Sequence, residues 1–218
     1  MTVLISGSSN GIGRACAAKF LSAGYNVIGL DRRAPDGLVG DNFRWIECDL
    51  SDSDSLPSLG DIDIVVSSAG VSEDRGFDAI PNNLLGCINF CERYADTPSI
   101  RAAVIIASIS GHNGMTPPYY SVAQGGLLSY TKNLAQRLSR YGAVVNSVSP
   151  GGVITRMNSR ILDDAKLYDR ALRETLLNKW ATAEEVADLV YFLTAVNKSI
   201  TGQDIIIDNG ECAKFNFV

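Results

Sequence analysis

Residues 3–13 read VLISGSSNGIG, an apolar run that ends in a loop containing three glycines. The run is typical of a buried strand, and the segment that follows it is expected to be a helix. Gly7 suits the tight exit from the strand, whereas Gly11 and Gly13 let the backbone approach a pyrophosphate held at the helix N-terminus. A glycine-rich loop alone indicates only a flexible turn. Because strand, loop and helix follow one another here, the stretch predicts a dinucleotide-binding site.

An acidic residue ends the second predicted strand. Asp31 lies 20 residues beyond Gly11, the separation at which a carboxylate accepts hydrogen bonds from the hydroxyls of the adenosine ribose. A carboxylate there also repels a 2′-phosphate, so Asp31 favours NAD over NADP. Arg32 and Arg33 leave the alternative open, because an arginine beside the ribose accommodates that phosphate. Two solvated surface charges are the simpler interpretation of these arginines.

Short apolar runs alternate with helix-length segments along the chain. Seven strands are predicted, at Val3–Ser6, Asn26–Asp31, Arg44–Cys48, Asp63–Ser68, Ala102–Ser108, Ala143–Ser149 and Asp204–Asp208. Most are continuous apolar runs, which is the pattern of parallel strands covered on both faces by helices. The sequence therefore predicts a single doubly wound Rossmann-type α/β domain over residues 1–218, with a mostly parallel seven-stranded sheet.

The helices are located by their end signals. They are expected from about Ile12 to Gly24, Pro81 to Tyr94, Tyr120 to Tyr141 and Thr182 to Ala195. The last opens with Thr-Ala-Glu-Glu, a capping box in which Thr182 and Glu185 satisfy free backbone donors. The stretches after Asp49 and Gly70 are too short for full crossover helices, so abbreviated connections are predicted there.

Bulk properties restrict the function. A formal net charge of -5 without a basic cluster disfavours nucleic acid or an anionic membrane as partner and favours a small-molecule substrate. No apolar run approaches the roughly 20 residues that span a bilayer, and no signal sequence precedes Val3, so a cytoplasmic protein is expected. The five cysteines include no Cys-x-x-Cys pair, so neither a disulfide framework nor a metal site is indicated. Cys87 and Cys91, one helical turn apart, are expected to be buried.

Further segments resemble the short-chain dehydrogenase/reductase family, and the resemblance covers essentially the whole chain. The spacing of Gly7, Gly11 and Gly13 is similar to that family's fingerprint rather than to Gly-x-Gly-x-x-Gly. The other matching segments are CDL at 48–50, SSAG at 67–70, NLLG at 83–86, ASISG at 107–111, NSVSPGGVIT at 146–155 and TGQDIIIDNG at 201–210. The short segment between Gly70 and Asn83 resembles compact bacterial members such as hydroxysteroid dehydrogenase/carbonyl reductase.

The resemblance implies an NAD site built from several strand ends. The residues it assigns to the cofactor are Gly7, Ser9, Asn10, Gly11, Ile12, Gly13, Asp31, Arg32, Asp49, Leu50, Ser68, Ala69, Gly70, Tyr120, Gln124, Pro150, Gly151, Val153 and Thr155. The substrate pocket is expected between Val71–Asp78, His112–Tyr119 and the segment from about Arg156 to Trp180. A homodimer or homotetramer formed through the helices near 81–94 and 120–141 is also implied.

The implied chemistry moves a hydride between nicotinamide and a carbinol carbon. Tyr120 passes the proton to or from oxygen, Ser108 holds the substrate oxygen, and Asn83 anchors a water-mediated proton path by interrupting its helix. The family's Tyr-x-x-x-Lys reads Tyr120-Ser-Val-Ala-Gln124 in this chain. Gln124 should lie on the same helix face, about 6 Å along the axis. An uncharged amide therefore takes the place of the lysine that contacts the nicotinamide ribose and supports the tyrosinate.

Gln124 keeps two hypotheses open beside an NAD-dependent alcohol dehydrogenase or carbonyl reductase of altered efficiency. One is a dinucleotide-binding protein without turnover that acts as a sensor or structural subunit, and the other is an active enzyme into which glutamine was introduced to impair it. Retention of Asn83, Ser108 and Tyr120 together favours an enzyme. The single histidine, His112, could orient substrate, but it is left outside the catalytic set because serine and tyrosine need no second acid.

Overall fold

A sheet of seven parallel strands forms the centre of the computed structural model, which describes residues 1–214, with only the backbone described over 73–75. The strands are β1 (Thr2–Ser6), β2 (Asn26–Asp31), β3 (Phe43–Glu47), β4 (Ile64–Ser67), β5 (Ala102–Ile106), β6 (Val144–Pro150) and β9 (Asp204–Ile207). Their order is β3-β2-β1-β4-β5-β6-β9, and every neighbouring pair is parallel. The predicted doubly wound α/β fold with a seven-stranded sheet is confirmed.

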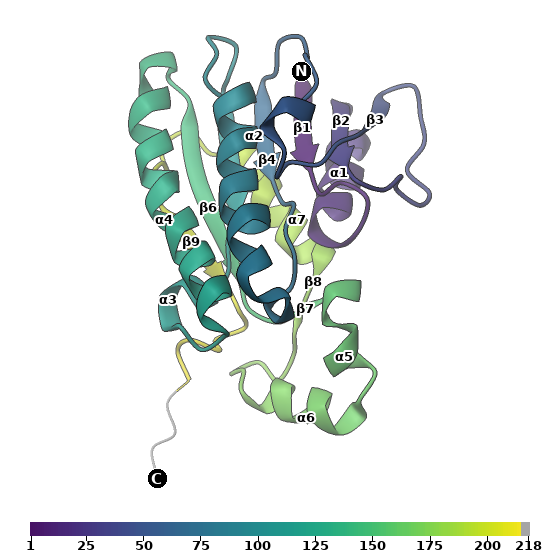
Figure 1. The fold of residues 1–218 in the computed structure, drawn as a ribbon, viewed down its shortest axis with the longest axis vertical. Helices are drawn as coiled ribbons and strands as arrows, with labels where there is room; N and C mark the ends of the chain where they lie inside the picture. The colour runs from purple at the N-terminus through teal and green to yellow at the C-terminus, as the bar shows by residue number, and fades with distance from the viewer. Residues whose placement is uncertain (215–218) are drawn as a thin grey trace.

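Helices cover both faces of this sheet (Figure 1). α2 (Gly86–Tyr94) and α4 (Pro118–Leu138) lie side by side on one face. α1 (Gly11–Ser22) and α7 (Ala183–Tyr191) pack against each other on the opposite face. Each connection between strands therefore crosses one face of the sheet, which is the arrangement that parallel strands require.

The first strand shows why its sequence is continuously apolar. Leu4 packs in the core beneath α2 and α4, whereas Val3 and Ile5 pack in the core beneath α1 and α7. Successive side chains of a strand point to opposite faces, and all three are fully buried. A strand with a core on both sides has no solvent-facing position, so it carries no polar alternation.

The four predicted helices form with small changes at their ends. The one predicted from Pro81 begins as a π-helical turn, Ile80–Leu85, before α2. The one predicted to reach Ala195 consists of α7 and a π-helical turn, Phe192–Val196. Its capping box is present: the Thr182 hydroxyl accepts the Glu185 N–H at 3.2 Å, and the Glu185 carboxylate accepts the Thr182 N–H at 2.9 Å.

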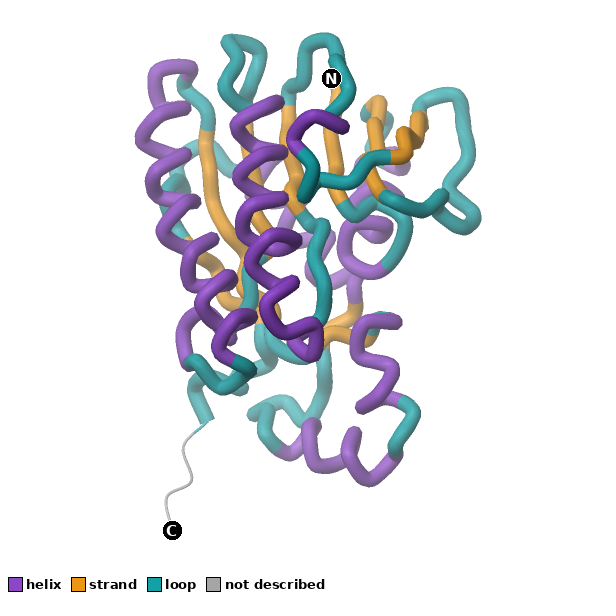
Figure 2. Tube along the Cα trace, in the orientation of Figure 1, coloured by secondary structure: helices purple, strands orange, loops and turns teal. Residues whose placement is uncertain are grey.

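Several short elements that the sequence did not predict gather beyond the carboxyl ends of the strands. They are α3 (Ser110–Asn113), β7 (Val153–Ile154), α5 (Ser159–Leu162), α6 (Ala165–Arg173) and β8 (Ala181–Thr182). β7 and β8 pair in parallel, and α5 and α6 project below the sheet in Figures 1 and 2. The connection after Asp49 contains a single turn, Ser53–Ser55, so it is abbreviated as predicted.

Two expectations from the composition, on membrane-spanning segments and on the cysteines, can be compared with the described residues. No helix within residues 1–214 is both long enough and apolar enough to span a membrane. The five cysteines are free thiols, and Cys87 and Cys91 are buried in the core on the α2 side of the sheet.

Candidate active site

A cleft of about 1170 Å³ lies at the carboxyl ends of the strands. Its wall is built from the loops after β1, β2, β3, β4, β5 and β6, from the first turns of α4 and from the α5–α6 segment. Parallel α/β sheets bind ligands at this edge, where the order of the strands reverses. The reversal in this sheet lies between β1 and β4. The loop that contains the three glycines is therefore at the expected place for a ligand.

Gly7 and Gly11 shape the surface of this loop. Gly7 has φ 68°, and a Cβ there would stand 2.8 Å from Cα of Ala69. Only glycine allows this turn so close to the end of β4. Gly11 has φ 53°, and its Cβ position is 3.5 Å from Thr155 across the cleft. Both glycines line the cleft, and they leave its floor bare of side chains.

Gly13 has a different task from the one expected. It does not line the cleft among the described residues, and a Cβ on it would stand 2.2 Å from the Gly7 carbonyl oxygen. Gly13 therefore lets α1 pack directly against the loop instead of admitting a ligand. Ser9 also lies behind the surface: its N–H donates to Asp31 at 3.0 Å, and its hydroxyl donates to the Arg33 carbonyl oxygen.

The other predicted cofactor residues lie along the cleft. Those that line it are Gly7, Asn10, Gly11, Ile12, Asp31, Arg32, Asp49, Leu50, Ser68, Ala69, Gly70, Tyr120, Gln124, Pro150, Gly151, Val153 and Thr155. They come from five of the seven strand ends and from α4, so the fold brings together residues that are distant in sequence.

Two carboxylates mark the end of the cleft that β2 and β3 form. Asp31 accepts backbone N–H groups of Ser9 at 3.0 Å and of Arg33 at 3.2 Å, one on each oxygen. Each oxygen keeps a lone pair for a further donor. Asp49 accepts the Ser51 hydroxyl at 2.7 Å, and Arg32 lies 3.7 Å from its other oxygen. The Ser51 hydrogen bond, assisted by Arg32, lowers the pKa of Asp49 below its usual value.

Asn83 lies in the π-helical turn that precedes α2. Its Oδ1 accepts the Val71 N–H at 2.7 Å, and its Nδ2 donates to the Val71 carbonyl oxygen at 3.1 Å. These bonds fix the chain just after Gly70, whose Cβ position is 3.1 Å from Oδ1 of Asn83. The helix is interrupted at Asn83 as expected, and the side chain is buried at 3% exposure.

Ser108, Tyr120 and Gln124 line the same cleft. The strand that was predicted to reach Ser108 ends at Ile106 in the structure. Ser108 therefore lies in the loop beyond β5, where its Oγ is 3.2 Å from the Ser110 hydroxyl. Tyr120 lies in the first turn of α4, and Gln124 follows one turn later. Gln124 is 95% buried, given its 5% exposure, yet its Oε1 has no hydrogen-bond partner among the described residues. An acceptor that is buried and unpaired on a cleft wall fits a ligand that donates a hydrogen bond.

His112 is not among the described residues that line the cleft. It belongs to α3, not to a loop, and its Nε2 lies 2.7 Å from Oδ2 of Asp204 on β9. Ser147 and Ser149 donate to the other oxygen of Asp204 at 2.6 and 2.9 Å. His112 therefore joins α3 to the edge of the sheet and does not line the cleft.

The predicted substrate segments contribute unequally. Val71 and Ser72 line the cleft from the first segment, and Thr116 does so from the second. The segment from 156 to 180 contributes most, with Met157, Asn158, Arg160, Ile161, Leu167, Ala171, Glu174 and Trp180. Glu211, which follows β9, also lines the cleft and was not predicted. Burial, followed by the negative charge of Asp208, raises the pKa of Glu211.

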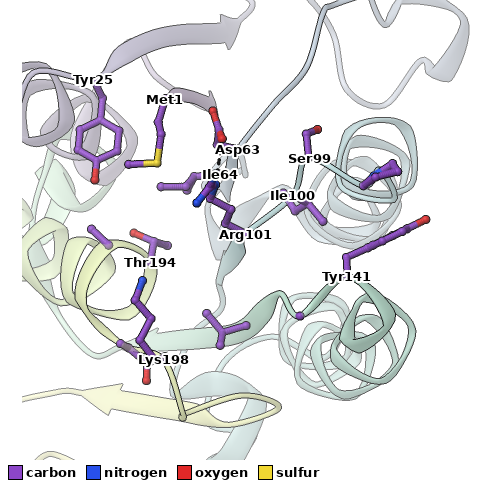
Figure 3. Close-up of a pocket in the computed structure, with 15 residues that line it drawn as sticks. Met1, Tyr25, Asp63, Ile64, Ser99, Ile100, Arg101, Tyr141, Thr194 and Lys198 are labelled. Carbon is purple, nitrogen blue, oxygen red and sulfur yellow. Dashed lines mark hydrogen bonds and ion pairs between the residues drawn. The ribbon is translucent and has the colours of Figure 1, made fainter.

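A second cavity of about 580 Å³ lies at the amino ends of the strands, opposite the cleft (Figure 3). Tyr25, Ser99, Tyr141 and Lys198 line it, together with Arg101, which pairs with Asp63 at 3.2 Å. None of the predicted site residues borders this cavity. The chemistry of the protein is therefore assigned to the cleft at the carboxyl ends of the strands.

Comparison with known proteins gives the family. A family model described as enoyl-(acyl carrier protein) reductase matches residues 7–211. The 3-oxoacyl-(acyl-carrier-protein) reductase MabA of Mycobacterium avium is 30% identical over 233 residues, covering 96% of this chain and 89% of the relative. The chain belongs to the short-chain dehydrogenase/reductase family. It is an oxidoreductase of the kind that acts on CH–OH and C=O groups with NAD or NADP.

Two further similarities bear on this short-chain dehydrogenase/reductase. Glucose 1-dehydrogenase of Gluconobacter oxydans is 28% identical and covers 95% of this chain and 90% of its own. The crystal structure of a putative 2-deoxy-d-gluconate 3-dehydrogenase from Agrobacterium tumefaciens, with bound NADP, has a TM-score of 0.88 at 26% identity, covering 98% of this chain and 96% of its own. The particular resemblance to hydroxysteroid dehydrogenase/carbonyl reductase stays a prediction.

The cleft fits a nicotinamide dinucleotide. The bare floor at Gly7 and Gly11 lies at the N-terminus of α1, where backbone N–H groups and the helix dipole favour a pyrophosphate. The unpaired Oε1 of Gln124 offers an acceptor to a ribose hydroxyl at the other end.

Proposed function

We propose that the protein interconverts a secondary alcohol and a carbonyl compound with NAD(H) as the cofactor. The observation that carries this proposal is that Ser108, Tyr120 and the glycine loop line one cleft. A bound nicotinamide supplies or accepts the hydride. Tyr120 gives its phenolic proton to the carbonyl oxygen during reduction and takes it back during oxidation. Ser108 donates a hydrogen bond to the same oxygen and so positions it.

Gln124 supplies an acceptor without charge. Its amide holds a ribose hydroxyl through Oε1 and thereby positions the cofactor, but it does not stabilise a tyrosinate as an ammonium group would. Alcohol oxidation needs the ionised tyrosine and is the slower direction near neutral pH. Carbonyl reduction uses the protonated tyrosine, so we propose that the protein works better as a reductase.

The cofactor preference rests on Asp31. Its two oxygens accept one backbone N–H each and keep lone pairs for the ribose diol. A 2′-phosphate at this place meets a negative charge, which favours NAD. Arg32 is the residue that could reverse the preference, but it lies 3.7 Å from the Asp49 carboxylate and so already has a counter-charge.

A substrate screen with a matched variant tests the proposal. The native protein and Tyr120→Phe are mixed with carbonyl compounds and NADH, and the loss of nicotinamide absorbance is followed. Because the variant loses one hydroxyl and little packing, turnover should fall at least about a hundredfold, while NADH affinity should stay within about twofold. Equal rates in the two proteins would show that the proton comes from elsewhere.

The second candidate is a dinucleotide-binding protein without turnover, and the uncharged Gln124 favours it. The same screen separates the two candidates, because a protein of this second kind binds NADH but does not oxidise it, whichever carbonyl compound is added.

Assembly is a further part of the proposal. Val122 on α4 and Leu85 before α2 are 63% and 48% exposed, and such apolar side chains suit a homodimer or homotetramer formed through these helices, which light scattering would detect.

A further inference from the structure

The Glu211 carboxylate lies on the wall of the cleft beside Gly151, which is one of the predicted cofactor residues. It follows β9, and its Oε2 lies 2.9 Å from the point at which a Cβ on Gly151 would stand. Any side chain on Gly151 would displace this carboxylate. Gly151 belongs to the turn after β6, so Glu211 is placed where the cofactor end of the cleft meets the substrate end.

Gly152, the next residue of the same turn, packs against an aromatic ring. A Cβ on Gly152 would stand 2.2 Å from Cε2 of Trp180, so the indole packs directly on the backbone. The ring of Tyr168 meets Trp180 edge-on, with the centroids 5.5 Å apart. Both Trp180 and Glu211 line the cleft. Two consecutive glycines therefore hold an indole and a carboxylate against the same turn.

The Glu211 carboxylate has no cationic partner within the part of the chain that the structure describes. Burial and the neighbouring Asp208 raise the pKa of Glu211, and the backbone of Gly152 only partly offsets them. Glu174 and Arg160 also line this end of the cleft, but both are exposed, so solvent screens their opposite charges.

We propose that the substrate is an uncharged compound bearing a hydroxyl group besides the reacting one, such as a polyol or a hydroxyketone, and that this hydroxyl donates a hydrogen bond to Glu211. The inference rests on the proposed function and names its substrate class. A hydroxyl satisfies Glu211 whether the carboxyl is ionised or protonated. A substrate without a donor offers Glu211 no hydrogen bond in place of the water that it displaces, and an anionic substrate is repelled by the partly buried Glu211 carboxylate. Apolar side chains also line this end of the cleft: Met157, Ile161, Leu167 and Ala171.

Three cyclohexane derivatives of similar size test this assignment. They are 1,2-cyclohexanediol, cyclohexanol and 3-hydroxycyclohexanecarboxylate, and their binding to the protein saturated with NAD is measured by calorimetry, beside the rate of NADH formation. The diol should bind about tenfold more tightly than cyclohexanol, which is the effect of one hydrogen bond to a charged group. The carboxylate should bind most weakly of the three.

Variants test whether Glu211 causes this order of binding affinities. Glu211→Gln keeps the shape and removes the charge, so it should strengthen carboxylate binding about tenfold and reduce the advantage of the diol. Glu184→Gln, at an exposed site on α7 that does not line the cleft, should change neither. Glu211→Asp withdraws the carboxylate by one methylene and provides a second variant if the glutamine protein fails to fold; it should also reduce the diol advantage.

Different results would refute the proposed substrate class and the proposed hydride transfer. No measurable diol binding at millimolar concentration, equal binding of all three compounds, or an order that Glu211→Gln and Glu211→Asp leave unchanged would overturn the assignment of substrate class. The expected binding order without any NADH formation would support the assignment and count against hydride transfer as the function.

Discussion

Replacing Gln124 by lysine is the most informative single change in this protein. Gln124 lies four residues after Tyr120 on α4, and both side chains line the cleft. Lysine has a similar length, so its ammonium group would enter the space that the unpaired Oε1 of Gln124 now borders. The change adds one positive charge beside the proposed proton donor and alters little else.

The size of the effect follows from Coulomb's law. Two unit charges about 5 Å apart at an effective dielectric of about 20 interact by about 3 kcal/mol, which equals about two pH units of titration. The positive charge favours the tyrosinate, which is the form that alcohol oxidation needs. The pH profile of oxidation should therefore move about two units toward acid, and its rate near neutrality should rise. Reduction uses the protonated tyrosine and should gain much less.

The assay compares both directions of the reaction at saturating cofactor from about pH 5 to about pH 10. Gln136→Lys is the matched control, because Gln136 is exposed on the same helix and does not line the cleft. The control should leave both profiles unchanged. If Gln124→Lys changes neither rate nor profile, another group has taken over the role of the missing charge, and Gln124 does not make oxidation the slower direction.

Three further outcomes test other parts of the molecule. Asp31→Asn should lower the preference for NADH over NADPH by about tenfold, because a negative charge beside the 2′-phosphate is removed; fluorescence titration with both cofactors measures this, and an unchanged ratio would contradict it. Gly13→Ala should lower the free energy of unfolding by more than about 3 kcal/mol, because its Cβ would stand 2.2 Å from a backbone oxygen, whereas Gly60→Ala enters open space and should cost under about 0.5 kcal/mol; similar urea midpoints would refute the packing role of Gly13. The pKa of Glu211 is raised, so the native protein loses stability as the pH rises through that pKa, and Glu211→Gln should raise the Tm at pH 8 but not at pH 4; equal shifts at both pH values would be the contrary result.

The features that the sequence predicted correctly depend on local chemistry. The seven strands were predicted because a strand buried on both faces must be apolar throughout, as Val3, Leu4 and Ile5 are. The capping box of Thr182 and Glu185 was predicted because both partners lie within one turn. In each case the residues that determine the structure are neighbours in the chain.

The features that the sequence missed depend on contacts between distant segments. His112 meets Asp204 across 92 residues, and Glu211 meets the turn at Gly151 only because β9 pairs with β6. No pattern around either residue reports such a pairing. α6 is different, because it carried a usable signal: the carboxylate of Asp164 caps its first turn by accepting two backbone N–H groups, and an aspartate before a helix-length segment is a recognised start signal.

Gly111 shows how one small residue can determine the geometry of the proposed catalytic group. A Cβ on it would stand 2.9 Å from the carbonyl carbon of Gln124, so the turn that follows Ser108 packs against the backbone of α4. α3 and α4 are held in contact at this point. Ser108 precedes Gly111 by three residues and Tyr120 precedes Gln124 by four, so this contact joins the two parts of the cleft wall that carry Ser108 and Tyr120. A side chain at Gly111 would push these two segments apart while leaving every proposed catalytic residue in the sequence, which is why the residues of the site can be read from a sequence before its geometry can.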